Sequence, residues 1–263
     1  MALAELSPLD LRLADDFDRA YADRPFAPLA IVIAAYNEEH SVGHVVTALP
    51  AEVCGLATQV IVVNDGSSDA TADAAGRAGA LVCDAGVNRG QGAALRLGYH
   101  LARQRGAKYI MTTDADGQYL PEDMERVMAP LVSGEADFVS GSRRLGSTTS
   151  KDAVRNLGVV VFAALISLLV RQRVTDPSCG LRAMKAEVTG NVVLDQPQYQ
   201  ASELLISTAM GGYKLKEVPI AMKARRSGKT KKGGNLLYGW RFGSVVVGTW
   251  ARERRRSTNT KRS

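Results

Sequence analysis

The amino-acid sequence predicts an α/β fold in which a mostly parallel sheet is flanked by helices. Short apolar runs of strand length alternate with segments of helical spacing, the order typical of parallel sheets. The first run, Leu29–Ala35, is apolar throughout, which is the pattern of a strand buried on both faces. Polar and glycine residues follow almost every run. These observations predict a doubly covered sheet with a ligand site at one edge.

The predicted strands and helices succeed one another regularly along the chain. Helices are recognised by apolar residues three and four positions apart, and their ends by Pro, Gly, Ser or Asp. Predicted strands cover residues 29–35, 59–63, 80–83, 109–113, 138–140 and 216–220. Predicted helices cover residues 42–49, 70–78, 91–105, 157–170 and 199–210, and one more begins at Pro121.

The chain is predicted to divide into three parts. Residues 1–28 show loose helical spacing and end at two prolines, which indicates an amphipathic N-terminal extension packed on the outside of the domain. Residues 29–235 form the α/β domain. Residues 236–263 form a C-terminal helix and a basic tail. We expect disorder from Arg252 onward, because that stretch contains no apolar residue.

The overall composition is that of a soluble globular protein. The 263 residues are 46% hydrophobic and 23% charged, enough to bury a sizeable core. No stretch reaches the roughly 18 to 20 apolar residues that span a bilayer, and the N-terminus lacks the basic start and apolar run of a secretory signal. We therefore expect a cytoplasmic protein whose three scattered cysteines are reduced and structural.

Basic residues are concentrated at the C-terminal end. From Lys214 onward the chain has 15 basic residues and two acidic ones, although its net charge is only +6. The part before Lys214 is therefore acidic. Such a cationic segment suits phosphate groups, whether of a nucleotide, a nucleic acid or an anionic lipid surface.

Two aspartates follow the predicted strand 109–113. Residues two apart on an extended backbone point the same way, so Asp114 and Asp116 can present two carboxylates to one point. Two like charges held close together favour a cation, and carboxylates suit Mg²⁺ or Mn²⁺. Gln118 can add a neutral oxygen. The alternative is a solvated turn without metal.

Polar and glycine residues recur at the predicted carboxyl ends of five strands. In parallel sheets this edge is where ligands bind. A Rossmann dinucleotide loop is disfavoured, because the first turn has no glycine and the pair at 90 and 92 follows a later strand. The strand ends carry Tyr36-Asn37-Glu38, Asp65-Gly66, residues 88–92, residues 114–118 and Arg143.

Residues 157–170 form a run in which only Gly158 and Ser167 are neither aliphatic nor aromatic. As a helix the run is about 21 Å long at ~1.5 Å per residue, too short to span a bilayer. It predicts either a core helix or a helix lying partly in a membrane interface.

Seven motifs share one order along the chain: Tyr36-Asn37-Glu38, Val62-Val63-Asn64-Asp65-Gly66-Ser67-Ser68-Asp69, Asn88-x-Gly90-x-Gly92, Asp114-Ala115-Asp116-Gly117-Gln118, Gly141-Ser142-Arg143, Asp176-Pro177-Ser178-x-Gly180-Leu181-Arg182 and Glu217-Val218-Pro219-Ile220. Their order and spacing, from about residue 29 to 232, resemble family 2 glycosyltransferases. Within that family the chain is most similar to the dolichyl- or polyprenyl-phosphate mannosyl- and glucosyltransferases. It departs from their pattern at Ala34, Asn64 and Gly158, where Pro, Asp and Ser are usual.

The resemblance implies a GT-A fold for residues 29–235, the catalytic domain. It also implies inverting transfer from a UDP- or GDP-linked sugar, with Mg²⁺ or Mn²⁺ as cofactor. By position, the nucleotide would be bound by Tyr36, Glu38, Asp65, Asp114, Arg225 and Lys231. The metal would be bound by Asp114, Asp116 and Gln118. The acceptor phosphate would meet Arg143 and Arg155.

Catalysis would rest on Asp116, Arg143 and Asp176. A departing nucleoside diphosphate gathers negative charge, which a metal and fixed cations stabilise. The acceptor is either a phosphate, which needs no base, or a hydroxyl, which does. Asp176 is the first candidate for that base or for orienting the acceptor, and Glu203 is the second. For each acid, a helix cap or an ion pair is the alternative.

Three hypotheses of function follow. The first is a glycosyltransferase that acts on a polyprenyl phosphate, peripherally bound at the cytoplasmic face of the membrane. The second is a soluble enzyme that glycosylates a hydroxyl of a small metabolite. The third is a nucleic-acid-binding protein that uses the basic tail. We expect no nucleic-acid partner, because the basic run lacks interleaved aromatic residues and the acids at the strand ends repel phosphate unless a metal is bound.

Overall fold

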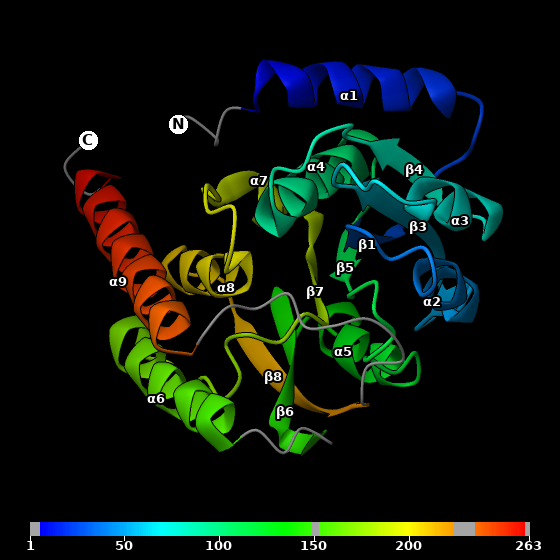
Figure 1. The fold of residues 1–263 in the computed structure, drawn as a ribbon. Helices are drawn as coiled ribbons and strands as arrows, with labels where there is room; N and C mark the ends of the chain where they lie inside the picture. The colour runs from blue at the N-terminus through cyan, green and yellow to red at the C-terminus, as the bar shows by residue number, and fades with distance from the viewer. Residues whose placement is uncertain (1–5, 149–152, 224–234, 261–263) are drawn as a thin grey trace.

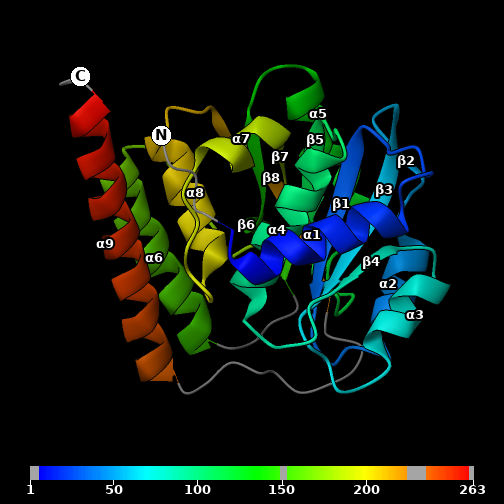
Figure 2. The ribbon, with the colours of Figure 1, turned by 90° about the horizontal axis from the view of Figure 1, so that it is seen from above.

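A computed structural model describes residues 6–148, 153–223 and 235–260 of the chain. Its described residues form one eight-stranded sheet covered by helices (Figures 1 and 2). The strands are β1 (Leu29–Ala35), β2 (Glu52–Val53), β3 (Leu56–Asn64), β4 (Leu81–Asp84), β5 (Tyr109–Thr112), β6 (Phe138–Thr148), β7 (Arg182–Lys185) and β8 (Leu215–Met222). The helices are α1 (Pro8–Ala20), α2 (Val42–Ala48), α3 (Thr71–Arg77), α4 (Gln91–Gln104), α5 (Asp123–Val132), α6 (Ala153–Val170), α7 (Ala186–Asn191), α8 (Gln200–Met210) and α9 (Asn235–Thr260).

The sheet has the order β2-β3-β1-β5-β7-β6-β8, with β4 paired to β3. Strands β1, β3, β4 and β5 are mutually parallel, as are β6 and β8, which confirms the predicted mostly parallel sheet. Strand β7 is antiparallel to both of its neighbours, β5 and β6. The first residue of β7, Arg182, therefore lies opposite the last residue of β5, Thr112, so the loop before β7 reaches the edge predicted for the site.

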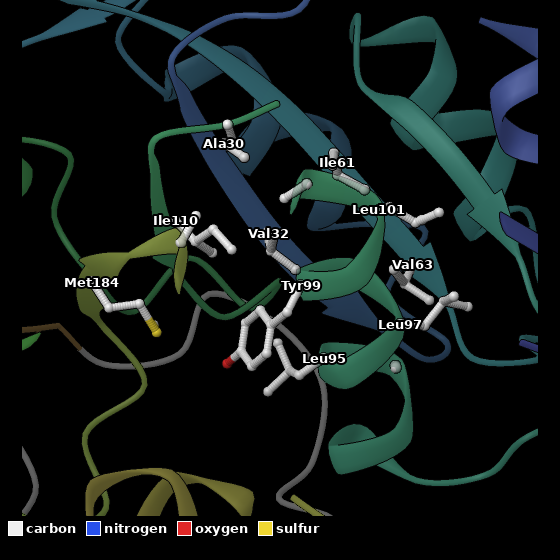
Figure 3. Close-up of a cluster of buried hydrophobic side chains, with 14 of the residues drawn as sticks. Ala30, Val32, Ile61, Val63, Leu95, Leu97, Tyr99, Leu101, Ile110 and Met184 are labelled. Carbon is white, nitrogen blue, oxygen red and sulfur yellow. The ribbon is translucent and has the colours of Figure 1, made fainter. Parts of the chain in front are cut away.

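The core forms on both faces of the sheet, because alternate residues of β1 point in opposite directions. Ala30 and Val32 pack in one cluster with Tyr99 of α4 (Figure 3). Residues of α1 and α7 belong to the same cluster, so these helices cover the same face. Leu29 and Ile31 belong to a cluster with α5 on the opposite face. Both faces of the sheet are covered here, and β1 is buried along nearly its whole length, as its apolar run predicts.

The N-terminal extension is a helix packed on the outside of the domain, as predicted. Helix α1 begins in a capping box in which Ser7 and Asp10 bond each other's backbone amides. The helix lies over α4 (Figure 1), and Ala14 and Phe17 bury its apolar face in the cluster around α4. Asp10 also pairs with Arg89 at 2.6 Å, which fastens the helix to the loop before α4.

The C-terminal elements α6, α8 and α9 pack together beside the sheet (Figure 2). The apolar run is helical and shared between two environments: Ile166 is fully buried against α8 and α9, whereas Leu168 is 76% exposed. The prediction of disorder from Arg252 onward is wrong as far as Thr260, because α9 continues to that residue. Arg252 forms ion pairs across to the loop before α8 and to α8 itself, which holds the helix where apolar contacts are lacking.

Candidate active site

The loops after β1 and β3 are joined by side-chain hydrogen bonds. Asn37 has a φ of 51°, a left-handed conformation that Asn tolerates better than most residues. Its backbone N–H donates to Ser67 Oγ at 2.9 Å, and its Oδ1 accepts from the backbone N–H of Ser68 at 2.9 Å. Two predicted nucleotide ligands flank Asn37 in the chain. Tyr36 is exposed, and Glu38 accepts a bond from Ser41 Oγ at 2.7 Å.

Asp65 holds the glycine-rich loop that precedes α4. Its buried carboxylate accepts backbone N–H bonds from Arg89 at 3.0 Å and from Gly90 at 2.8 Å. Gly66 lies against the same loop, where a Cβ would stand 2.4 Å from the backbone nitrogen of Asn88. The Asn64-Asp65-Gly66 and Asn88-x-Gly90-x-Gly92 motifs therefore form one packed unit. The contact of Asp65 with a nucleotide stays a prediction.

The two aspartates of the predicted metal site follow β5 directly. Asp116 is buried and accepts the backbone N–H of Gln118 at 3.1 Å, while Asp114 is half-buried and accepts from Gln91 Nε2 at 3.4 Å. Gly180 lies beside Asp114, and a Cβ there would stand 2.8 Å from Asp114 Oδ1. A glycine in the loop before β7 thus makes room for this carboxylate.

The metal would need further ligands besides these acids. No group of three or more His, Cys, Asp or Glu side chains in the described ranges is placed to hold an ion. Gln118 donates its side-chain Nε2 to the backbone carbonyl of Lys223 at 3.0 Å, and the backbone carbonyl of Gln118 accepts the Lys223 N–H at 2.9 Å. Gln118 therefore anchors the Asp-x-Asp turn to the end of β8, and its role as a metal ligand stays a prediction.

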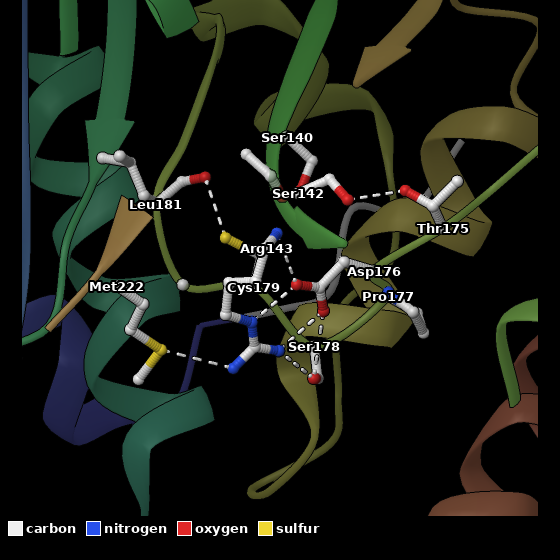
Figure 4. A network of polar contacts seen from close by, with 12 residues as sticks. Ser140, Ser142, Arg143, Thr175, Asp176, Pro177, Ser178, Cys179, Leu181 and Met222 are labelled. Atoms are coloured by element: carbon white, nitrogen blue, oxygen red, sulfur yellow. Dashed lines mark hydrogen bonds and ion pairs between the residues drawn. The ribbon is translucent and has the colours of Figure 1, made fainter. Parts of the chain in front are cut away.

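Arg143 and Asp176 form a buried, two-pronged ion pair (Figure 4). Arg143 Nε donates to Asp176 Oδ2 and Arg143 Nη2 to Asp176 Oδ1, both at 2.6 Å, and the backbone N–H of Arg143 adds a third bond to Oδ2 at 3.1 Å. Ser178 Oγ accepts from Nη2 at 2.8 Å. Arg143 Nη1 points to the thioether sulfur of Met222 at 3.5 Å, which is a weak acceptor.

The ion pair fixes the protonation state of both partners. Burial acts to raise the pKa of Asp176, but the hydrogen bonds and charge of Arg143 outweigh burial and hold that pKa below its usual range. Burial likewise acts to lower the pKa of Arg143, and Asp176 raises it instead. Asp176 is therefore an ionised, fully paired carboxylate. This geometry favours the ion-pair alternative over a general base.

Glu217 of β8 holds the backbone on which Asp176 lies, a role that the motif alone did not reveal. Its carboxylate accepts the backbone N–H groups of Thr175 at 2.7 Å and of Asp176 at 2.9 Å. Burial raises the pKa of Glu217, which is the cost of placing an acid there. Tyr119, also missed, accepts the backbone N–H of Gly180 at 2.7 Å. Residues 175–180 are thus held from both sides.

The remaining predicted residues lie elsewhere or outside the described ranges. Glu203 of α8 is fully buried and bonds the backbone of Asp195 and Gln196, and burial raises its pKa to about 7. Arg155 lies near the start of α6, and its side chain is outside the described part. Two predicted nucleotide ligands, Arg225 and Lys231, also fall outside that part.

The comparisons with known proteins agree with this architecture. Residues 30–192 match the family model described as glycosyl transferase family 2. The chain is 34% identical over 206 residues to a dolichyl-phosphate hexose transferase of Haloferax volcanii, covering 78% of this chain and 87% of that protein. It is 27% identical over 221 residues to an undecaprenyl-phosphate mannosyltransferase of Micrococcus luteus, covering 78% and 88%.

The fold also matches a solved enzyme structure. Glucosyl-3-phosphoglycerate synthase from Mycobacterium tuberculosis, in complex with Mn²⁺, UDP-glucose and phosphoglyceric acid, superposes with a TM-score of 0.68 at 20% identity. The match covers 90% of this chain and 84% of that one, and it confirms the predicted GT-A fold. The chain therefore belongs to glycosyl transferase family 2 and is a nucleotide-sugar-dependent glycosyltransferase.

Proposed function

We propose that this enzyme transfers a sugar, with inversion, from a UDP- or GDP-linked donor to a polyprenyl phosphate. One observation carries the choice of acceptor: the two acids predicted as candidates for a general base are already paired, Asp176 with Arg143 and Glu203 with Arg252. A hydroxyl acceptor needs a base, whereas a phosphate is already an anion and attacks without one. The names of the two polyprenyl-type relatives support the same acceptor.

The carboxylates of Asp114 and Asp116 fit Mg²⁺ or Mn²⁺. Hard oxygen donors suit these ions, which commonly take one or two protein carboxylates together with substrate phosphates. The clearance that Gly180 leaves beside Asp114 is consistent with a ligand there. When bound, the ion would neutralise charge on the departing diphosphate. The solved neighbour was crystallised with Mn²⁺ and UDP-glucose, and in another complex with Mg²⁺ and UDP.

The protein's own residues would bind and orient the two substrates. Tyr36 and Glu38 contact the base and ribose, and the loop held by Asp65 lies beside them. Arg143 presents Nη1 to the acceptor phosphate, which replaces the weak contact to Met222. Asp176 keeps the guanidinium in one orientation by engaging its other two nitrogens. The acceptor is thus positioned by a guanidinium whose orientation is fixed.

We further propose a peripheral membrane contact at the cytoplasmic face, made by helices α6 and α9. Each carries exposed apolar side chains seven positions apart, and so on one face of the helix: Val161 and Leu168 on α6, Trp240 and Val247 on α9. Exposed arginines accompany them, which suit an anionic lipid surface. In the described ranges no helix has both the length and the apolar character needed to cross a bilayer.

The proposal is tested by a transfer assay with purified protein, Mn²⁺ and a panel of UDP- and GDP-sugars. Undecaprenyl phosphate in detergent micelles is one acceptor, and phosphorylated and hydroxylic small metabolites are the others. We expect a lipid-linked product whose anomeric configuration is opposite to that of the donor. Transfer to the small metabolites alone would establish the soluble alternative instead.

Asp116→Asn tests the metal site in the same assay. The substitution keeps the size of the side chain and removes a ligand charge, so we expect transfer to be abolished and the thermal unfolding midpoint to stay near that of the wild type. EDTA should have the same effect on the unmodified enzyme. Full activity in chelator would contradict the metal assignment.

A further inference from the structure

The loop between α7 and α8 packs closely against the glycine-rich start of α4. Pro197 accepts the backbone N–H of Gly92 at 2.9 Å, and Gln196 accepts from Arg96 Nη1 at 2.9 Å. A Cβ at Gly92 would stand 2.0 Å from the carbonyl oxygen of Gln196, and one at Gly90 would stand 2.7 Å from that of Pro197. The two glycines are therefore required by this contact between loops.

The far side of the same glycine-rich loop is held by Asp65. The backbone N–H groups of Arg89 and Gly90 both point to its carboxylate. The loop is consequently clamped between Asp65, at the carboxyl end of β3, and residues 196–197. A shift of residues 196–197 would move the N–H groups that Asp65 binds.

Glu203 of α8 holds the loop between α7 and α8 in place. Its two carboxylate oxygens accept the backbone N–H groups of Asp195 at 3.0 Å and of Gln196 at 3.1 Å. The side chain is completely buried, so water does not compete for these bonds. Two backbone donors on a buried carboxylate define the position of the loop closely.

Arg252 of α9 completes the clamp. Its Nη1 bonds Asp195 Oδ1 at 2.6 Å and Glu203 Oε1 at 3.0 Å, and its Nη2 bonds the carbonyl of Val193 at 2.7 Å. One guanidinium thus holds the loop at two points and neutralises the buried acid beneath it. The C-terminal helix is connected through this side chain to the start of α4.

We propose that Glu203 and Arg252 are positioning residues for the donor nucleotide, acting through residues 195–197 and the glycine-rich loop on Asp65. The inference rests on the proposed function, because it takes Asp65 as part of the nucleotide site. It assigns α9 a role in donor binding that requires no contact between α9 and the substrate. Glu203 thereby serves the donor side of the reaction and not the acceptor side.

The test is calorimetric titration of the full chain with UDP and, separately, GDP, in the presence of Mn²⁺. We expect Arg252→Met to weaken binding of the nucleotide that the wild type binds by about tenfold, a typical size for coupling between sites. Arg254→Met is the matched control, because Arg254 lies on the same helix and its guanidinium is 5.1 Å from the Trp250 ring centroid. That variant should bind like the wild type, and Arg252→Lys should recover part of the loss.

A second substitution disturbs the same path from its other side. Gly92→Ala pushes against the carbonyl of Gln196, so it should also weaken nucleotide binding. Adding Arg252→Met to it should then have less effect than Arg252→Met alone, because both changes release one loop. In kinetics the KM for the donor should rise while the KM for the acceptor stays constant. A merely structural role would lower the unfolding midpoint and leave the Kd of the folded protein unchanged.

The outcomes separate the inference from the proposed function. If the wild type binds a nucleotide and Arg252→Met binds it equally well while folded, the inference is wrong and the proposed function stands. If Arg252→Met fails to fold, Glu203→Gln decides by the same titration. A wild type that binds neither UDP nor GDP would overturn the proposed donor, and the inference with it.

Discussion

Replacing Asp176 by Asn separates the two roles considered for this residue. The substitution preserves the shape of the side chain and removes its charge, so Arg143 is left as a cation that is 12% exposed and without its carboxylate. Removing one partner of a buried ion pair costs about 3–5 kcal/mol, because the other charge stays buried and unpaired. We therefore expect Asp176→Asn to lower the free energy of unfolding by about that amount.

Urea denaturation of four proteins measures this cost: the wild type, Asp176→Asn, Arg143→Met and the double variant. If the pair is structural, the double variant should lose less stability than the sum of the single losses, since neither charge is then left alone. The slope of the free energy of unfolding against urea concentration should be the same for all four proteins, so that their midpoints can be compared. Wild-type stability in Asp176→Asn, together with a large loss of turnover and of the acidic limb of the pH profile, would refute this reasoning and identify Asp176 as the base.

The pH dependence of stability provides a second measurement on the same variants. The pKa of Asp176 is lower in the folded protein than in the unfolded chain, where it is about 3.9. The contribution of ionised Asp176 to the free energy of unfolding is therefore fully present above the unfolded-state pKa, and it is lost as the pH falls through the folded-state pKa. Below about pH 4 the wild-type unfolding midpoint should fall toward that of Asp176→Asn, and the two curves should converge.

Two further predictions concern the metal side and the membrane. Gly180→Ala places a Cβ 2.8 Å from Asp114 Oδ1, so the carboxylate must move. Because a small displacement of a catalytic group costs a large factor in rate, we expect at least about a tenfold loss of turnover and a higher Mn²⁺ concentration for half-maximal activity. Gly248→Ala, which has open space, should have neither effect. The wild type should float with anionic vesicles at low salt and be released at high salt. Leu168→Glu with Trp240→Glu should abolish flotation without loss of fold, because these side chains are 76% and 77% exposed.

The sequence predicted those features that depend on local pattern. The strands β1 and β3 were recognisable because burial on both faces requires a continuous apolar run. The motifs at their carboxyl ends were recognisable because parallel strands bring those ends to one edge. Strand β7 was missed: it has four residues, of which Arg182 and Lys185 are charged, and it is defined by its two neighbours in the sheet.

The contacts that define the site join residues far apart in the chain, and no local pattern reports them. Arg143 and Asp176 are separated by 33 positions, so the sequence left a base and an ion pair equally open for Asp176. The length of α9 was missed for a similar reason. Its last turns lack apolar residues, and Arg252 is fastened instead to Glu203, 49 positions earlier.

The reversed direction of β7 brings one loop to both the proposed acceptor site and the proposed metal site. Because β7 is antiparallel to β5, the loop that enters it lies at the edge where the Asp-x-Asp turn leaves β5. Within five residues this loop provides Asp176, which orients the arginine proposed for the acceptor, and Gly180, which makes room for the aspartate proposed for the metal. Glu217 holds the first of these residues by its backbone. A displacement of the loop would therefore disturb donor and acceptor together, so Glu217→Gln should raise the KM for both substrates, in contrast to Arg252→Met.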